Sequence, residues 1–111
     1  ASGSSMVTGV TVARKEFLEE NEEAVKAFME EHKASAEAIN ADPATGAVLA
    51  VEAQIVAKEP IAQKAIPNCN ISFSKGEAMH KAVEGMLTVL FEANPKSIGG
   101  KLPDKDFYYG I

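Results

Sequence analysis

The sequence predicts a helix-rich α/β fold in a single domain, and three observations lead to that class. The chain has 111 residues, which is a natural size for one domain. Residues 7–13 are β-branched and apolar, and residues 69–73 alternate apolar with polar side chains, as strands do. In the segments between and after them, apolar residues recur at steps of three and four, as on one face of a helix.

The first strand is predicted over residues 7–13, with Gly9 as a bulge or a place where another backbone comes close. The second is predicted over residues 69–74, where Cys69, Ile71 and Phe73 alternate with polar residues. Two short strands do not form an independent sheet of ordinary size, and the first strand needs a partner for at least one edge. The pattern therefore indicates a piece of a larger fold, or an oligomer.

The helices follow from capping signals and apolar periodicity. After a short helical turn in RKEFLEE, Asn21 is the expected N-cap of a helix over residues 22–40. Asp42 and Pro43 start the next helix, and a short third helix is expected over residues 59–65. Ser74 and Glu77 have the spacing of a capping box, which predicts that the strongest helix runs over residues 75–93.

Composition excludes some classes of function. Hydrophobic residues make up 46% of the chain and charged residues 24%, as in an ordinary globular domain. The net charge of −5 argues against a nucleic-acid partner, since phosphate backbones select basic surfaces. No apolar run is long enough to span a membrane. Residues 1–6, ASGSSM, lack the apolar core of a signal peptide and are interpreted as a tag or linker ahead of residues 7–111.

The residues that could carry chemistry are few. His32 lies on the apolar stripe of its helix, which favours a core or boundary position, and His80 lies beside the stripe of the last helix, where we expect it to be solvated. Cys69 is expected to be a small buried hydrophobe, because no histidine lies near it in sequence. The cluster at residues 107–109 is more typical of a tail anchor than of a ligand platform. We expect no enzyme activity, metal or cofactor.

A resemblance to a known family adds to this pattern. TGVTVARKEFLEENEEAVKAFMEEHKASAEAINADPATG, residues 8–46, resembles the segment after the second inter-lobe crossing in solute-binding proteins of ABC importers. The similar proteins are those for nitrate, taurine, alkanesulfonates and thiamine precursors. The matching positions are Thr8 to Val10, Arg14 to Asn21, Ala24 to Phe28, Ser35, Asn40 and Pro43. The tail NPKSIGGKLPDKDFYY resembles the C-terminal end of some of these proteins, whereas Glu22 stands where they commonly have proline.

The resemblance implies that residues 7–111 are the C-terminal portion of such a protein, a partial lobe of the two-lobe periplasmic-binding-protein fold. In that family a small solute is captured between two lobes and delivered to the membrane permease. The implied partners are the solute, the permease and the missing N-terminal lobe, and a homodimer is a further expectation. The implied location is periplasmic or extracellular, with the full-length protein anchored to the membrane as a lipoprotein.

Five ligand-binding candidates follow from the resemblance by position. Ser5, Met6, Thr8 and Gly9 would approach the cleft from the crossing strand, and Asn70 is a lesser candidate. In this family the ligand meets strand ends and helix N-termini, where N–H and hydroxyl groups can bind an anion. Thr8 and Gly9 are equally well explained as strand residues, and Asn70 as a turn residue.

A second interpretation remains open. The chain could be a small stand-alone helical interaction domain that dimerises through its exposed strand at residues 7–13. An enzyme is the third and weakest interpretation, because no catalytic triad, metal set or phosphate loop is found in the sequence.

Overall fold

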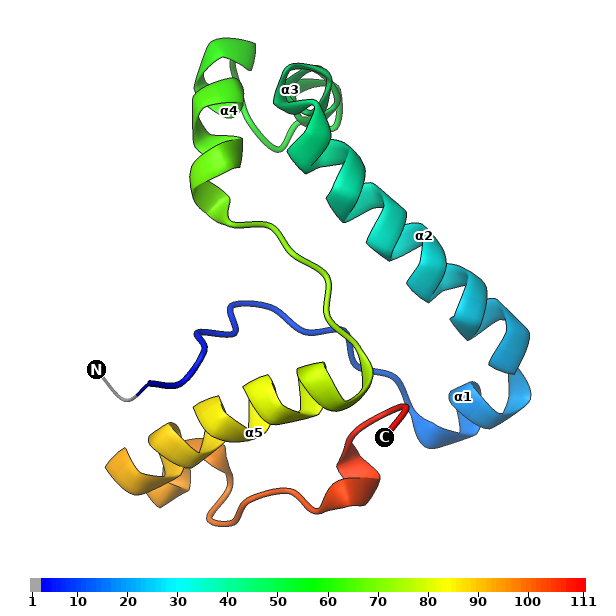
Figure 1. Ribbon diagram of the computed structural model, residues 1–111, viewed down its shortest axis with the longest axis vertical. Coiled ribbons are helices and arrows are strands. Elements are labelled where there is room, and N and C mark those ends of the chain that lie inside the picture. Colours follow the sequence, from blue (N-terminus) through cyan, green and yellow to red (C-terminus); the bar gives the residue numbers. More distant parts are fainter. Residues whose placement is uncertain (1–2) are drawn as a thin grey trace. The chain divides into compact units, whose positions relative to one another are not determined.

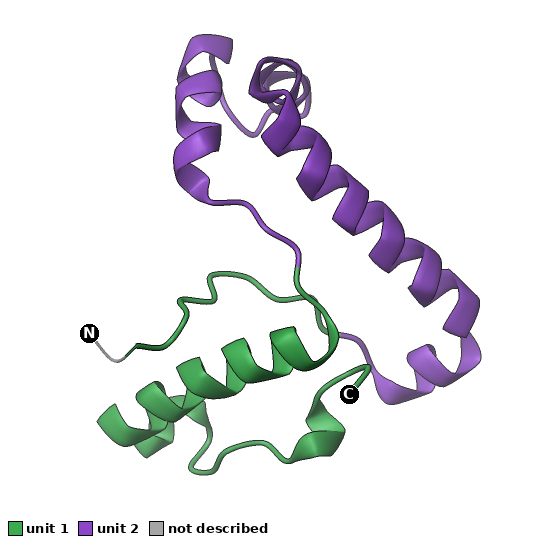
Figure 2. Ribbon diagram, in the orientation of Figure 1, with its two compact units in different colours: residues 1–12, 74–111 green, residues 13–73 purple. Residues whose placement is uncertain are grey.

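The computed structural model describes residues 3–111, and the fold is helical (Figure 1). Helices account for 66% of the structure, and the described part of the chain contains no strand and no sheet. The predicted α/β class is therefore wrong. The chain divides into two compact units (Figure 2), of which unit 1 comprises residues 1–12 and 74–111 and unit 2 comprises residues 13–73.

Unit 2 begins with two consecutive helices, α1 (Lys15–Glu20) and α2 (Glu22–Ala41). Asn21 separates them at the N-cap position predicted for α2, but its side chain serves the other helix: Nδ2 donates to the carbonyl of Phe17 at 3.0 Å. The first turn of α2 is acidic, as the helix dipole favours. Lys26 Nζ lies 3.2 Å from Glu22 and 3.5 Å from Glu23, and hydrogen bonding to Glu22, followed by its charge, raises the pKa of Lys26.

The core of unit 2 lies where α3 (Pro43–Glu52) and α4 (Glu59–Ala65) pack together and meet α2 and η1 (Ile66–Cys69). Asp42 caps α3 as predicted, because its side chain accepts from the backbone N–H of Thr45 at 3.1 Å. The buried residues of this cluster are Ala47, Ala62 and Ile66, against which Ile39 and Val56 pack. Small residues at the contact allow the helix backbones to approach closely.

Unit 1 is built around one long helix, α5 (Gly76–Ala93), followed by η2 (Pro95–Ile98) and η3 (Lys105–Phe107). Asn94 ends α5 and caps η2 by accepting from the N–H of Lys96 at 3.2 Å. No residue of α5 is fully buried, even though its apolar stripe is as regular as the sequence predicts. The stripe is half-buried from Met79 to Leu87, and Leu90 is 37% exposed.

The predicted strand at residues 7–13 is wrong. Residues 7–13 form no regular secondary structure and make no backbone–backbone hydrogen bond within residues 3–111, and β propensity alone does not make a strand. No sheet forms because the backbone of no other segment of residues 3–111 hydrogen-bonds to the backbone of residues 7–13.

The predicted strand at residues 69–74 is also wrong, for a local reason. Pro67 lies in η1, which continues through Cys69, and Asn70 then adopts a left-handed conformation with φ 53°. Both features interrupt an extended run. The alternation of the sequence survives only as partial burial, because Ile71 and Phe73 are half-buried whereas Cys69 is exposed.

The helix predictions fare better. The helices expected at 22–40, 59–65 and 75–93 are confirmed as α2, α4 and α5 to within a residue. The predicted capping box at Ser74 is wrong, because Lys75 occupies the N-cap of α5 and makes no side-chain cap hydrogen bond there. Gly76, with φ 62°, begins the helix, so the sequence signal lies one residue out of register.

Candidate functional site: the N-terminal segment on α5

Residues 5–12, here called the N-terminal segment, meet α5 at one well-defined point. The backbone N–H of Val7 donates to Sδ of Met86 at 3.2 Å. One residue earlier on the helix, a Cβ at Gly85 would come within 3.0 Å of Oγ of Ser4. The absence of a side chain at Gly85 therefore leaves room for the Ser4 side chain beside α5.

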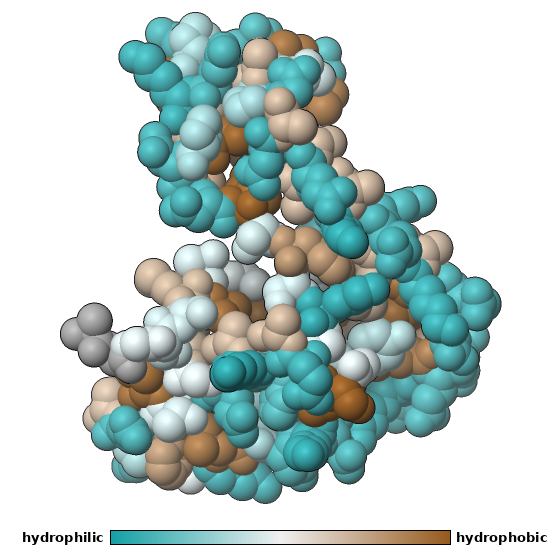
Figure 3. Space-filling view, viewed as in Figure 1, coloured by the Kyte–Doolittle hydropathy of each residue, from teal (hydrophilic) through white to brown (hydrophobic). Residues whose placement is uncertain are grey.

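The rest of the N-terminal segment lacks a partner within unit 1. Within residues 3–111, no backbone–backbone hydrogen bond involves any residue from 5 to 12. Its large apolar side chains are open to solvent, with exposed fractions of 83% at Met6, 64% at Val10 and 79% at Val12. Figure 3 shows apolar side chains at the surface of the molecule. A backbone without backbone–backbone hydrogen bonds, beside exposed apolar side chains, is a surface suited to a polypeptide partner.

Four of the five predicted ligand residues lie on the N-terminal segment. Ser5, Met6, Thr8 and Gly9 are all exposed, so their polar groups are accessible. A Cβ at Gly9 would meet nothing within 4 Å, so no backbone approaches this glycine closely. These four residues lie close together because they are neighbours in the sequence, and not because the fold brings distant segments together.

Asn70, the fifth candidate, belongs to the other unit and has a local role. Its backbone is left-handed, a conformation that asparagine tolerates better than most residues, and its Nδ2 lies 3.4 Å from the carbonyl of Asn68. The neighbouring carbonyl of Ile71 accepts from Nδ2 of Asn40 at 2.7 Å, which joins this turn to α2. The alternative interpretation of Asn70 as a turn residue accounts for its geometry.

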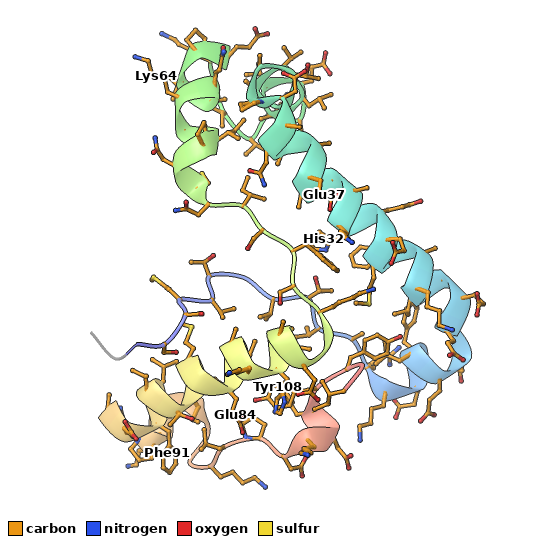
Figure 4. The ribbon with its side chains drawn as sticks, in the orientation of Figure 1. His32, Glu37, Lys64, Glu84, Phe91 and Tyr108 are labelled. Carbon is orange, nitrogen blue, oxygen red and sulfur yellow. The ribbon has the colours of Figure 1, made fainter. Side chains whose placement is uncertain are left out.

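A second cluster of functional groups lies between α5 and the tail, and sequence reasoning missed it. The side chain of His80, expected to be solvated, is only 12% exposed. Its Nδ1 lies 3.6 Å from a carboxylate oxygen of Glu77, and its Nε2 lies 3.7 Å from one of Glu84. The ring of Tyr108 covers it at a centroid distance of 4.3 Å. Figure 4 labels Tyr108 and Glu84 of this cluster. The expectation that His80 is solvated is therefore wrong.

Tyr108 is the tail anchor that the aromatic cluster at residues 107–109 predicted, and it packs against His80 of α5. The residue is 8% exposed, whereas Phe107 and Tyr109 beside it are exposed. Its hydroxyl is buried and has no hydrogen-bond partner in the described structure. Burial, followed by the charge of Glu84, raises the pKa of Tyr108. The i, i+4 spacing of His80 and Glu84 was the sequence signal that could have located this cluster.

His32 is exposed, although its ring makes edge contacts with Phe28 at 5.6 Å and with Phe73 at 5.3 Å. The expected core or boundary position is therefore supported only by these two contacts. Cys69, predicted to be buried, is exposed, so that prediction is wrong. Residues 3–111 contain no group of three His, Cys, Asp or Glu side chains arranged to hold a metal ion. None of the helices in this part of the chain is long and apolar enough to cross a membrane.

No family model, no curated protein and no solved structure matches this chain.

Proposed function

We propose that the chain acts as the C-terminal part of the solute-binding component of an ABC importer, with no chemistry of its own. The observation that carries this proposal is the N-terminal segment. It is apolar, extended and without a backbone partner, and it lies where the family resemblance places the passage between the lobes. The backbone groups of this segment that make no hydrogen bond within residues 3–111, and its exposed Met6, Val10 and Val12, would be covered by the rest of the assembled protein.

Under this proposal the solute is a small anion or a carboxylate-bearing molecule held between this part and the N-terminal lobe. Ser5, Thr8 and Gly9 would supply hydroxyl and backbone N–H groups from one wall of the cleft. One wall provides only part of the contacts and does not exclude water, so the isolated chain should bind solute weakly. The assembled protein would work outside the cytoplasm and pass the solute to a permease.

Reconstitution tests this function. The chain is mixed with the complementary N-terminal piece of a solute-binding protein of this type, and nitrate, taurine, an alkanesulfonate and a thiamine precursor are titrated by calorimetry. We expect association of the two pieces, binding of one solute by the pair, and none by the chain alone. Thr8→Val, which removes the hydroxyl but keeps the shape, should weaken solute binding, and Thr11→Val serves as its control. Failure of the pieces to associate, or micromolar binding by the chain alone, contradicts the proposal.

A second candidate is a small helical interaction domain that forms a homodimer. The same unpartnered N-terminal segment favours it, because two copies could pair their free backbone groups across a two-fold axis. Light scattering at tens of micromolar distinguishes the two: a dimer that dissociates on dilution, and that Val10→Lys abolishes, supports self-association. A monomer at every concentration excludes it.

A further inference from the structure

We propose that Met86 holds the N-terminal segment on α5 and that oxidation of the Met86 sulfur releases this segment. This inference does not depend on the proposed transport function. It rests on the polar contact between Val7 and Met86, in which a backbone N–H lies 3.2 Å from the methionine sulfur. No backbone–backbone hydrogen bond in residues 3–111 supports the segment elsewhere.

A thioether is a weak acceptor, and it is also the atom of this contact that a peroxide can modify. A hydroperoxide transfers one oxygen atom to Sδ: the S–O bond forms, the O–O bond breaks, the sulfur loses two electrons, and the peroxide leaves as water or an alcohol. Met86 is half-buried, so its sulfur is not sealed from small oxidants.

The product does not fit the geometry of the contact. Sδ and the nitrogen of Val7 are already at hydrogen-bond distance, so an added oxygen has no room on the line between them. The Val7 N–H must then move away from the sulfur, and the sulfoxide is polar where the half-buried thioether was apolar. Oxidation therefore displaces the segment from α5.

The chain has four methionines, and three of them can be removed to isolate the effect. The test variant carries Met6→Leu, Met29→Leu and Met79→Leu, which leaves Met86 as the only target. The matched control adds Met86→Leu, which keeps the apolar volume and removes the sulfur. Both are treated with hydrogen peroxide, oxidation is located by peptide mass mapping, and exchange of the Val7 amide is followed by NMR.

We expect exchange of the Val7 amide to speed up roughly 2- to 12-fold in the test variant, as for loss of a hydrogen bond of ordinary net strength. Peroxide should not change exchange in the control, and methionine sulfoxide reductase should restore the slow rate in the test variant. Unchanged or slower exchange after oxidation of Met86 overturns the proposal, as does failure of Met86 to oxidise.

Should the test variant lose its helical circular dichroism, the unmodified chain gives the same answer by graded oxidation. There, exchange at Val7 must follow the fraction of Met86 oxidised and not the fraction of exposed Met6. The opposite correlation overturns the proposal.

Discussion

Helix α2 of unit 2 and helix α5 of unit 1 both have a regular apolar stripe, but among the described residues an aliphatic core is found only in unit 2. In unit 2 the short helices α3 and α4 pack against each other through Ala47 and Ala62, and Ile66 completes the cluster. In unit 1 the longer helix α5 has an extended segment and an irregular tail beside it, and the buried side chain is the ring of Tyr108. Periodicity makes a helix face apolar, but a second helix with small residues at the contact is needed to bury that face.

The largest expected effect breaks the core that only unit 2 possesses. Ile66→Ala should lower the free energy of unfolding of unit 2 by about 2–5 kcal/mol, because it removes the largest buried side chain of the cluster and leaves a cavity. Ile61→Ala, at an exposed position on α4, is the control and should cost within about 0.5 kcal/mol. Urea unfolding followed by residue-resolved hydrogen exchange measures both. Equal losses for the two variants would mean that Ile66 is not part of a packed core.

Two helix glycines sharpen the comparison. A Cβ at Gly46 would lie 2.7 Å from Cγ1 of Ile39, inside the core of unit 2, whereas a Cβ at Gly85 would meet only the Ser4 hydroxyl at 3.0 Å. Gly46→Val should therefore destabilise by about 1–3 kcal/mol through overpacking. Gly85→Ala should stabilise α5 by up to about 1 kcal/mol, because alanine is the better helix former and the serine hydroxyl can move. Thermal unfolding followed by circular dichroism gives the sign of each, and a stabilising Gly46→Val would show that the core of unit 2 is loose.

A smaller effect concerns the buried aromatic ring of unit 1. Tyr108→Phe should raise the free energy of unfolding by about 1 kcal/mol, because it removes a buried hydroxyl that has no hydrogen-bond partner while keeping the ring against His80. Tyr109→Phe, on an exposed ring, is the control. Loss of stability in Tyr108→Phe would reveal a partner for the hydroxyl.

Tyr108 also leads to a prediction about the stability of the chain at alkaline pH. The pKa of Tyr108 is raised above its ordinary value of 10.0 by burial and then by Glu84. The folded chain therefore holds this proton more tightly than the unfolded chain does. The resulting stability is fully present below about pH 10 and is lost as the pH rises through the higher folded pKa. Tyr108→Phe should lack this part of the alkaline loss, as urea midpoints measured between pH 9 and 12 would reveal.

The smallest effect is the acid response of a helix cap in unit 2. Hydrogen bonding from the Thr45 side chain, and then from its backbone, lowers the pKa of Asp42 below 3.8. The folded chain thus releases the proton more readily, so the cap's contribution is present above pH 3.8 and is lost as the pH falls through the lower folded value. Asp42→Asn can still cap α3 but does not titrate, so its thermal midpoint should fall less between pH 4 and 2. Glu37→Gln controls for the loss of one charge.

The helices were predictable because their signals are local. Apolar spacing located α2 and α5, and Asp42 with Pro43 located the start of α3. The strands were not, because period-two apolarity reports side-chain chemistry whereas a strand requires a distant partner. The sequence placed Tyr108 among the anchor residues, but burial of His80 depends on how the tail folds back, which no pattern within α5 reports. The five ligand candidates rest on resemblance and stay predictions.

The N-terminal segment also bears on the lifetime of the chain in a cell. Proteases bind their substrates as extended backbone whose N–H and C=O groups are unoccupied, and residues 8–12 make no backbone–backbone hydrogen bond within residues 3–111. After Ala13, Arg14 and Lys15 offer trypsin-like cleavage positions at the start of α1. Whatever covers this stretch therefore also shields it from cleavage. The rate of proteolysis near residue 14 therefore measures the fraction of time for which a partner covers this segment, even when the partner is not identified.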